Sequence, residues 1–305
     1  MKKILFILIV FTQIGFSQES VSKPRLIVGI MVDGLQQRHL DQLWTRLDAN
    51  GFKKLAGEGA KFERVVCNIV SAGNVTDIAT LLTGTVPYYH GVVSTNVYDR
   101  STDKVTSVFS DKQQSGIETN LKLSAKSLRA NTIVDELMLA SQGNSKSYAI
   151  GIHPEDVIAL GGHGSNGVVW MDDVFMKWCS TAYYKGGMPW QAVDMNSSGG
   201  FQRIADRVWQ PLYAPNSYVS ALNEKNTTSF EYKATQKKSA KGAASILKNT
   251  PSANSLVAEL GLRICREEKL GLDQFPDALM LQFTVRPPFE KKLSVQSVEI
   301  GRAHV

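Results

Sequence analysis

The stretch Leu26-Ile-Val-Gly-Ile-Met-Val-Asp-Gly-Leu35 decides the fold of this chain. A continuous apolar run closed by an acid and a glycine is typical of a strand buried on both faces, as in a parallel sheet. Asp33 would then lie at the carboxyl end of that strand, where open α/β sheets place their chemistry. An Asp-Gly pair after a strand is also a common turn. This stretch alone leaves a ligand and a turn equally open.

The spacing of hydrophobic residues predicts the strands of a parallel sheet and the helices between them. Over 25–84 we expect a strand at 26–33, helices at 36–47 and from Phe52, a strand at 61–70, and a helix at 75–82. Later we expect a helix at 127–140 capped by Asn131 or Thr132, strands at 146–152, 157–160 and 168–171, a helix at 254–269, and a strand at 277–285. The alternation predicts an α/β fold with right-handed crossovers. It places Asp33 and segment 71–77 on one rim.

Both ends of the 305-residue chain are set apart from the fold. Residues 1–17 combine Lys2-Lys3 with an apolar run and a small-residue end, which predicts a signal peptide and an exported, periplasmic or secreted protein. Residues 300–305, Ile-Gly-Arg-Ala-His-Val, are encoded by ATCGGAAGAGCACACGTC, which is similar to a common sequencing adapter. We expect these six residues to be an artefact and 18–299 to be the N-terminal part of a longer domain.

Composition narrows the classes of function. With 43% hydrophobic and 20% charged residues the chain is globular. Without Lys2, Lys3 and Arg302, 31 basic residues face 28 acidic ones, too small an excess to predict nucleic-acid binding. No later segment has the apolar length of a transmembrane helix.

The chain has three cysteines, Cys67, Cys179 and Cys265. Their spacing fits no zinc motif, and one disulfide with a spare thiol stays open. Residues 178–249, rich in aromatic residues and then in lysine, predict a cap or insertion over the sheet rim.

An ordered set of motifs resembles the alkaline phosphatase superfamily, in its exported bacterial branch related to type I phosphodiesterases and nucleotide pyrophosphatases. The motifs are Val28-Gly-Ile-Met-Val-Asp-Gly-Leu35, Thr83-Gly-Thr-Val-Pro-Tyr-Tyr-His-Gly91, Val97-Tyr-Asp-Arg100, Thr132-Ile-Val-Asp-Glu-Leu137, Gly162-His-Gly164, Trp170-Met-Asp-Asp173, Thr250-Pro-Ser-Ala-Asn254 and Pro276-Asp-Ala-Leu279. The resemblance spans nearly the whole chain after the leader. It implies an alkaline-phosphatase-like core with a mostly parallel central sheet flanked by helices.

The chemistry that the resemblance implies is hydrolysis of phosphate mono- or diesters by two zinc ions and a Thr or Ser nucleophile at a helix start. One metal lowers the pKa of the nucleophile, the other stabilises the leaving oxygen, and the helix N-terminus binds the remaining oxygens. Asp33 matches the first metal ligand of the family. The nucleophile position instead holds Asn74, whose amide cannot act as a nucleophile. Thr76 could replace it only if the loop is rebuilt by two residues.

The positions that hold phosphate in the monoesterase relatives also differ. They fall on Thr95, with Asn96 as a neighbouring substitute, and on His153 and Glu155. A glutamate would repel a dianionic phosphate rather than bind it. The late metal ligands of the family are missing as well, because Phe283-Thr-Val-Arg286 occupies the place of the first.

Three functions remain open at this point. The first is an exported metal-dependent phosphate-ester hydrolase, present as a fragment with a degraded nucleophile loop, whose partner is a phosphorylated small molecule. The second is a catalytically inactive member of the same family with a binding or structural role at the cell envelope. The third is an unrelated Rossmann-like binding protein, which predicts a glycine-rich fingerprint that Gly34 alone does not supply.

Overall fold

The computed structural model describes residues 23–66, 69, 73–211, 213–214, 231–234 and 239–285. The predicted signal peptide and the suspected adapter residues 300–305 lie outside these residues. In chain order the strands are β1 (Leu26–Asp33), β2 (Asn96–Asp99), β3 (Lys104–Ser107), β4 (Gly116–Ile117), β5 (Ser147–Gly151), β6 (Gly167–Met171), β7 (Trp178–Thr181) and β8 (Asp277–Thr284).

The helices include two short 3-10 turns, η1 (Trp44–Arg46) and η2 (Ala125–Ser127). The α-helices are α2 (Gln37–Leu43), α3 (Phe52–Glu58), α4 (Asn74–Thr83), α5 (Pro87–His90), α6 (Ile133–Ala140), α7 (Pro154–Gly161), α8 (Trp190–Ser197), α9 (Gly200–Ala205), α10 (Ala240–Lys248) and α11 (Pro251–Glu267). None of the helices in the described part of the chain has the length and apolarity needed to cross a membrane.

One mixed sheet organises the molecule. Its strand order is β1-β8-β5-β6-β7-β4, and β2 and β3 form a separate hairpin. The pairs β1–β8, β8–β5 and β5–β6 are parallel, whereas β7 runs antiparallel to both β6 and β4. The predicted α/β fold with a mostly parallel sheet is confirmed.

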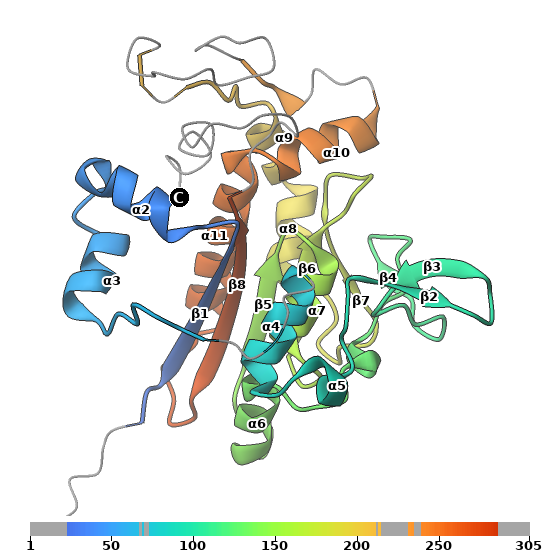
Figure 1. The fold of residues 1–305 in the computed structure, drawn as a ribbon. Helices are drawn as coiled ribbons and strands as arrows, with labels where there is room; N and C mark the ends of the chain where they lie inside the picture. Colours follow the sequence, from blue (N-terminus) through green and yellow to red (C-terminus); the bar gives the residue numbers. More distant parts are fainter. Residues whose placement is uncertain are drawn as a thin grey trace, which may run out of the picture.

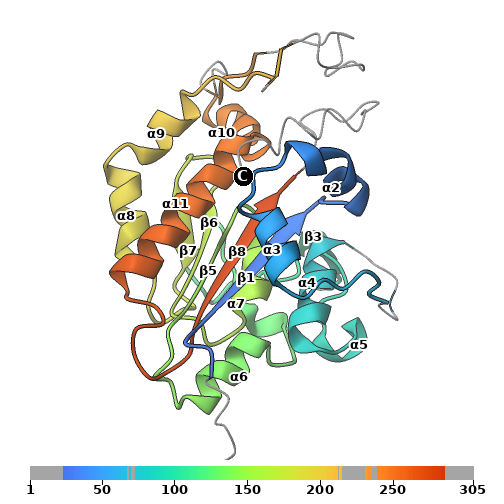
Figure 2. The ribbon, with the colours of Figure 1, turned by 90° about the vertical axis from the view of Figure 1, so that its left-hand side faces the viewer.

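Helices cover the two faces of this sheet (Figures 1 and 2). One face carries α4, α6 and α7, whose apolar side chains surround the buried Trp170. The other face carries α8 to α11 around Trp178. All eight residues of β8 are buried, because a strand in the middle of a parallel sheet is covered on both sides.

Local sequence accounts for several element boundaries. Thr132 caps α6 and forms a capping box with Asp135, so the expected helix begins at Ile133 rather than at 127. α4 ends at Gly84, which takes the left-handed conformation with φ 64° that favours glycine. α7 begins with Pro154, whose fixed φ suits the first helical turn.

Two predicted strands are wrong. Residues 61–66 form no strand. Their side chains are exposed, so this segment gains no burial that would stabilise it in a sheet. The predicted strand at 157–160 belongs to α7, which is almost entirely buried and therefore lacks the polar face that distinguishes an ordinary helix in a sequence.

The predicted cap at 178–249 begins inside the core. β7 is part of the sheet, and α8 contacts it through the buried Ala192 and Met195. The later, lysine-rich part contains α10, which packs against α11. A cap beyond these elements stays a prediction, since 215–230 lies outside the described residues.

Candidate functional site

The carboxyl ends of β1, β8 and β5 form one rim, because the three strands are parallel neighbours (Figure 1). Asp33 is the last residue of β1 and lies opposite Thr284 of β8. The Val285 N–H donates to the backbone oxygen of Asp33 at 2.7 Å, which continues the pairing past the end of β8. The Asp33 side chain is half-buried at this rim.

An amide from α11 fixes the end of β8 beside Asp33. Asn254 is buried, and its Nδ2 donates to the Thr284 oxygen at 2.8 Å while its Oδ1 accepts from the Thr284 N–H at 3.0 Å. Both backbone groups of Thr284 are therefore satisfied by one side chain. This contact holds the strand end in place without relying on a flexible loop.

A second buried amide connects β8 to the end of β5. The Ile152 N–H donates to Gln282 Oε1 at 2.7 Å, and Gln282 Nε2 lies 3.4 Å from Asp156 Oδ2 at the start of α7. A Cβ at Gly151 would come within 2.7 Å of the Gln282 side chain, so this close approach requires glycine. The rim is built from interlocked polar contacts between three elements.

The start of α4 gives the rim a helix N-terminus without a side-chain cap. Gly73 precedes the helix with φ 124°, a conformation open to glycine, and no side chain caps the first turn. Asn74 is the first helical residue and is half-buried. α4 packs along α7, and it runs down towards α5, so its N-terminus lies at the end of the sheet to which β1 and β8 point (Figure 1). Uncapped N–H groups at a helix start bind anions.

Thr76 lies in the interior. Its side chain is 0% exposed, and its hydroxyl has no hydrogen-bond partner within the described part of the chain. A substrate in the solvent does not reach a hydroxyl in this position. The buried position of Thr76 therefore disfavours its predicted role as a substitute nucleophile.

The four predicted substrate positions separate into two groups. His153 is the N-cap residue of α7 and Glu155 lies in its first turn, so both lie beside the end of β5 on the rim. Thr95 and Asn96 lead into the β2–β3 hairpin, outside the six-stranded sheet. Glu155 also has an ordinary structural reason to be there, because acidic residues stabilise helix N-termini.

A buried histidine ties α4 to the segment after it. His90 Nδ1 accepts the Val92 N–H at 3.1 Å, so the ring proton lies on Nε2, which is 3.0 Å from Thr80 Oγ1. Thr80 Oγ1 in turn donates to the Thr76 oxygen. Burial lowers the pKa of His90, because the protein interior disfavours the charged ring.

The described residues do not make up a zinc site. They contain no group of three or more His, Cys, Asp or Glu side chains placed to hold a metal ion. A structural or catalytic zinc needs at least three protein ligands, and Asp33 is the single residue for which the sequence predicts that role. Cys179 is buried in β7, and burial raises the pKa of its thiol. Cys265 is half-buried and reduced, and Cys67 lies outside the described residues.

Sequence reasoning missed Gln282 and the use that the rim makes of Asn254. Each is an amide among apolar residues of a buried strand or helix, and that is the signal that could have found them, because buried amides are almost always hydrogen-bonded. Their partners are 130 and 30 residues away in the chain, which no local pattern reveals.

Comparison with known proteins identifies relatives of this arrangement. Residues 27–241 match the family model described as type I phosphodiesterase / nucleotide pyrophosphatase. The chain is 25% identical over 298 residues to a protein named calcium-transporting ATPase from Myroides odoratus, and 24% identical over 314 residues to the alkaline phosphatase PafA of Elizabethkingia meningoseptica. These matches cover 93% and 98% of this chain but 54% and 57% of the relatives.

A solved structure shows the same fold. The crystal structure of the alkaline phosphatase PafA superposes with a TM-score of 0.80 at 23% identity, covering 92% of this chain and 57% of that one. The chain thus spans about half the length of the relatives it matches.

Proposed function

The chain belongs to the type I phosphodiesterase / nucleotide pyrophosphatase family, and from that premise we propose that its rim binds phosphate esters as part of a metal-dependent hydrolase site. The substrate class is a phosphorylated small molecule, either a monoester or a diester. The residues that carry the proposal are Asp33 at the end of β1 and Asn74 at the start of α4.

One observation supports this function above the others. α4 is a ten-residue helix that begins on the rim without a side-chain cap, after a glycine with a positive φ. The N–H groups of its first turn point out of the helix end, where the helix dipole adds a partial positive charge. A phosphoryl group with its negatively charged oxygens fits this end better than a neutral ligand does.

Hydrolysis itself is impaired in this chain, on our proposal, by the residue at the nucleophile position. A carboxamide nitrogen or oxygen does not replace the hydroxyl of Thr or Ser in attack on phosphorus. Thr76 is buried, and Glu155 brings a negative charge to the same rim. Zinc enters the proposal through the family resemblance. Asp33 contributes one carboxylate, and within the described residues no group of three or more His, Cys, Asp or Glu side chains is placed to hold a metal ion.

The second candidate function is that of an exported, catalytically inactive family member that binds a phosphorylated ligand at the cell envelope. Asn74 favours it, because an amide at a helix start still donates hydrogen bonds to phosphate oxygens although it cannot be phosphorylated. Export rests on residues 1–17 and is likewise a proposal.

Turnover and binding measured on the same samples separate the two functions. The chain with added zinc is assayed on an aryl phosphate and an aryl phosphodiester, and inorganic phosphate binding is measured by calorimetry. Zinc-dependent turnover that Asp33→Asn abolishes supports the hydrolase, and phosphate binding without turnover supports the inactive binder. Asp206→Asn, at the exposed end of α9, is the matched control and leaves both readouts unchanged. If the chain shows no turnover and binds no phosphate, both functions are contradicted.

A further inference from the structure

The sequence contains two Asn-Gly pairs, and the structure gives them opposite surroundings. Asn50-Gly51 lies in the turn between η1 and α3, and Asn166-Gly167 lies at the start of β6. In such a pair the backbone nitrogen of glycine is able to attack the side-chain amide carbon of asparagine, because glycine has no Cβ to hinder the approach. The rate of this reaction depends on how freely the two groups move.

The turn that holds Asn50 and Gly51 leaves both reacting groups free. Both residues are exposed. The Gly51 N–H donates to no other described residue, and no atom outside the neighbouring residues lies within 4 Å of the position that a Cβ on Gly51 would take. Asn50 Nδ2 donates to Asp48 Oδ1 at 3.3 Å, beyond the usual length of such a bond. Neither the nucleophile nor the amide is therefore held away from the other.

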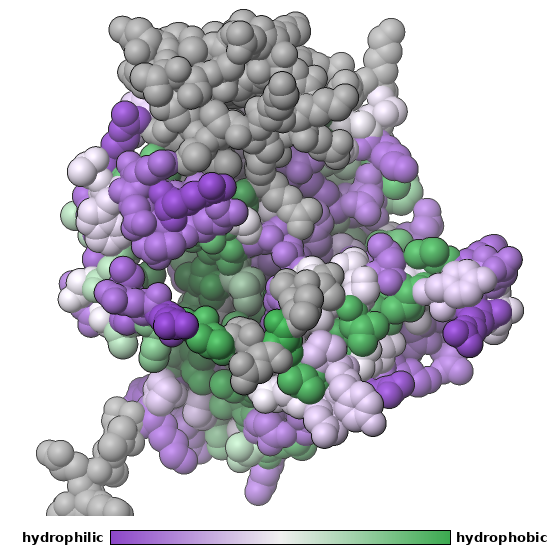
Figure 3. Space-filling model, viewed as in Figure 1, coloured by the Kyte–Doolittle hydropathy of each residue, from purple (hydrophilic) through white to green (hydrophobic). Residues whose placement is uncertain are grey.

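The helix that follows this turn restrains it little. α3 has no buried residue, and its N-cap residue Gly51 has a φ of 64°, which favours glycine. The space-filling view shows an apolar hollow between α2 and α3 on its left and α4 at its centre (Figure 3). Segments with few buried contacts open at a low free-energy cost. The turn is thus free to take the bent conformation that ring closure needs.

The second Asn-Gly pair is fixed by the sheet. Asn166 Oδ1 accepts the Ser147 N–H at 2.8 Å, and the Asn166 N–H donates to the Ser147 oxygen at 2.8 Å. Gly167 is buried and lies opposite Tyr148 in the β5–β6 pair. A Cβ at Gly167 would come within 2.8 Å of Pro189, which shows how closely this backbone is packed. Ring closure here requires β5 and β6 to separate first.

We propose that Asn50 is a site of spontaneous modification, where Asn50-Gly51 converts to aspartate and isoaspartate while Asn166-Gly167 stays intact. The Gly51 nitrogen bonds to Asn50 Cγ and gives up its proton to water, and ammonia leaves as the Cγ–Nδ2 bond breaks. Water then opens the cyclic imide. Addition at Cγ gives aspartate, and addition at the main-chain carbonyl gives isoaspartate, in which Cβ and Cγ join the main chain. The reaction needs no enzyme and is independent of the proposed function.

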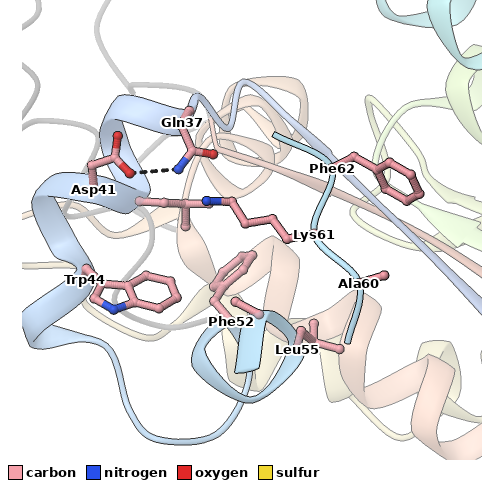
Figure 4. Close-up of a pocket in the computed structure, with 10 residues that line it drawn as sticks. Gln37, Asp41, Trp44, Phe52, Leu55, Ala60, Lys61 and Phe62 are labelled. Atoms are coloured by element: carbon pink, nitrogen blue, oxygen red, sulfur yellow. Dashed lines mark hydrogen bonds between the residues drawn. The ribbon is translucent and has the colours of Figure 1, made fainter. Parts of the chain in front are cut away.

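The isoaspartate product alters the pocket between α2 and α3. This pocket of about 560 Å³ is lined by Trp44, before the turn, and by Phe52, after it (Figure 4). Lys53 Nζ donates to the Leu47 oxygen at 2.7 Å and so joins the two sides of the turn. A longer main chain between Leu47 and Lys53 changes this contact and the spacing of the two aromatic rings. The aspartate product adds only a negative charge.

Peptide mass spectrometry after incubation at mildly alkaline pH tests the proposal, with labelling by isoaspartyl methyltransferase to identify the product. In the folded chain, modification at Asn50 should be roughly tenfold or more faster than at Asn166, because the paired strand must open first. In concentrated urea both pairs should react at similar rates, since the two dipeptides are the same. Asn50→Ser should remove the faster reaction and leave Asn166 unchanged.

Asn50→Asp is the control that separates charge from main-chain length. Hydrogen exchange of the α3 amides should be faster in the isoaspartate form than in Asn50→Asp, and near-ultraviolet circular dichroism checks that each variant is folded. The modification site is overturned if Asn50 stays intact in the folded chain over a time in which it reacts in urea, or if both pairs react equally fast in the folded chain. Equal exchange in the isoaspartate form and Asn50→Asp would overturn the change inferred at α3.

Discussion

At the scale of single residues, the buried hydroxyl of Thr76 gives a direct test of its role. Since that hydroxyl has no partner in the described structure, replacing it by a methyl group removes an unsatisfied polar group without changing the side-chain shape. We predict that Thr76→Val leaves the free energy of unfolding unchanged or raises it by about 1 kcal/mol, as measured by urea denaturation.

Thr80 is the matched control on the same helix. Its hydroxyl donates to the Thr76 oxygen and contacts His90, so Thr80→Val should lower the unfolding free energy by about 1 kcal/mol. Equal losses for the two substitutions would show that the Thr76 hydroxyl is engaged. A loss of phosphate-ester turnover in Thr76→Val alone would restore Thr76 as a candidate nucleophile.

His90 predicts the direction in which stability depends on pH. Its pKa is lowered in the folded protein by burial, so near pH 6 the unfolded chain binds more protons than the folded one. The stability that the neutral ring contributes is complete above the unfolded pKa, near 6.5, and is lost as the pH falls through that value towards the folded pKa.

Urea denaturation from pH 7.5 to 5 measures this effect. The unfolding free energy should fall with decreasing pH by at most about 1.4 kcal/mol per pH unit for this one group. His90→Gln should be less stable at pH 7.5 and show a shallower dependence. An unchanged slope in His90→Gln would refute the assignment.

The sequence correctly predicted the position of residues that lie at the end of a strand or the start of a helix. The sequence predicted that Asp33 ends the first strand and that Asn74 lies at a helix start, and both placements follow from local pattern. Exposure did not follow from the sequence. Thr76 and Asn74 are two residues apart on α4, and only packing against α7 decides that one is buried and the other half-buried.

At the scale of elements, the contact between α11 and the end of β8 makes a measurable contribution to the rim. Asn254→Ala would leave two buried backbone groups of Thr284 without partners. Each buried unsatisfied group costs about 1 to 3 kcal/mol, so the expected loss in unfolding free energy is about 2 to 6 kcal/mol.

The neighbouring residue on α11 provides the control. Ser255 is half-buried and makes one long hydrogen bond of 3.4 Å to Pro251, so Ser255→Ala should change stability by less than about 0.5 kcal/mol. Thermal unfolding of both variants measures the difference. If Asn254→Ala were as stable as Ser255→Ala, the contact would not hold the strand end.

Element prediction from the sequence was correct wherever periodicity and burial agree. The apolar runs of β1, β5, β6 and β8 were found, as were α4 and α11. α7 was missed because Val157-Ile-Ala-Leu160 is buried all round and resembles a strand, although Pro154 followed by two acids marks a helix start. The strand expected at 61–70 is rich in apolar residues, but Phe62, Val65 and Val66 in its described part are exposed.

At the scale of the whole molecule, the ordered motifs identified the family and the α/β class, because they fix the sequence of elements. Strand order did not follow from them. β8, the last described strand, is inserted between β1 and β5, and this long-range placement brings Asp33 into line with the ends of β8 and β5. No local pattern contains that information, since parallel neighbours are joined by crossovers of a dozen or more residues.

The proposed function depends on phosphate binding at the start of α4. Backbone amide shifts of Gly73, Asn74, Val75 and Thr76, recorded by two-dimensional NMR during titration with inorganic phosphate at constant ionic strength, measure it most directly. We expect saturable shifts at these four amides that chloride does not produce. Shifts spread over the surface lysines, with none at these amides, would contradict it.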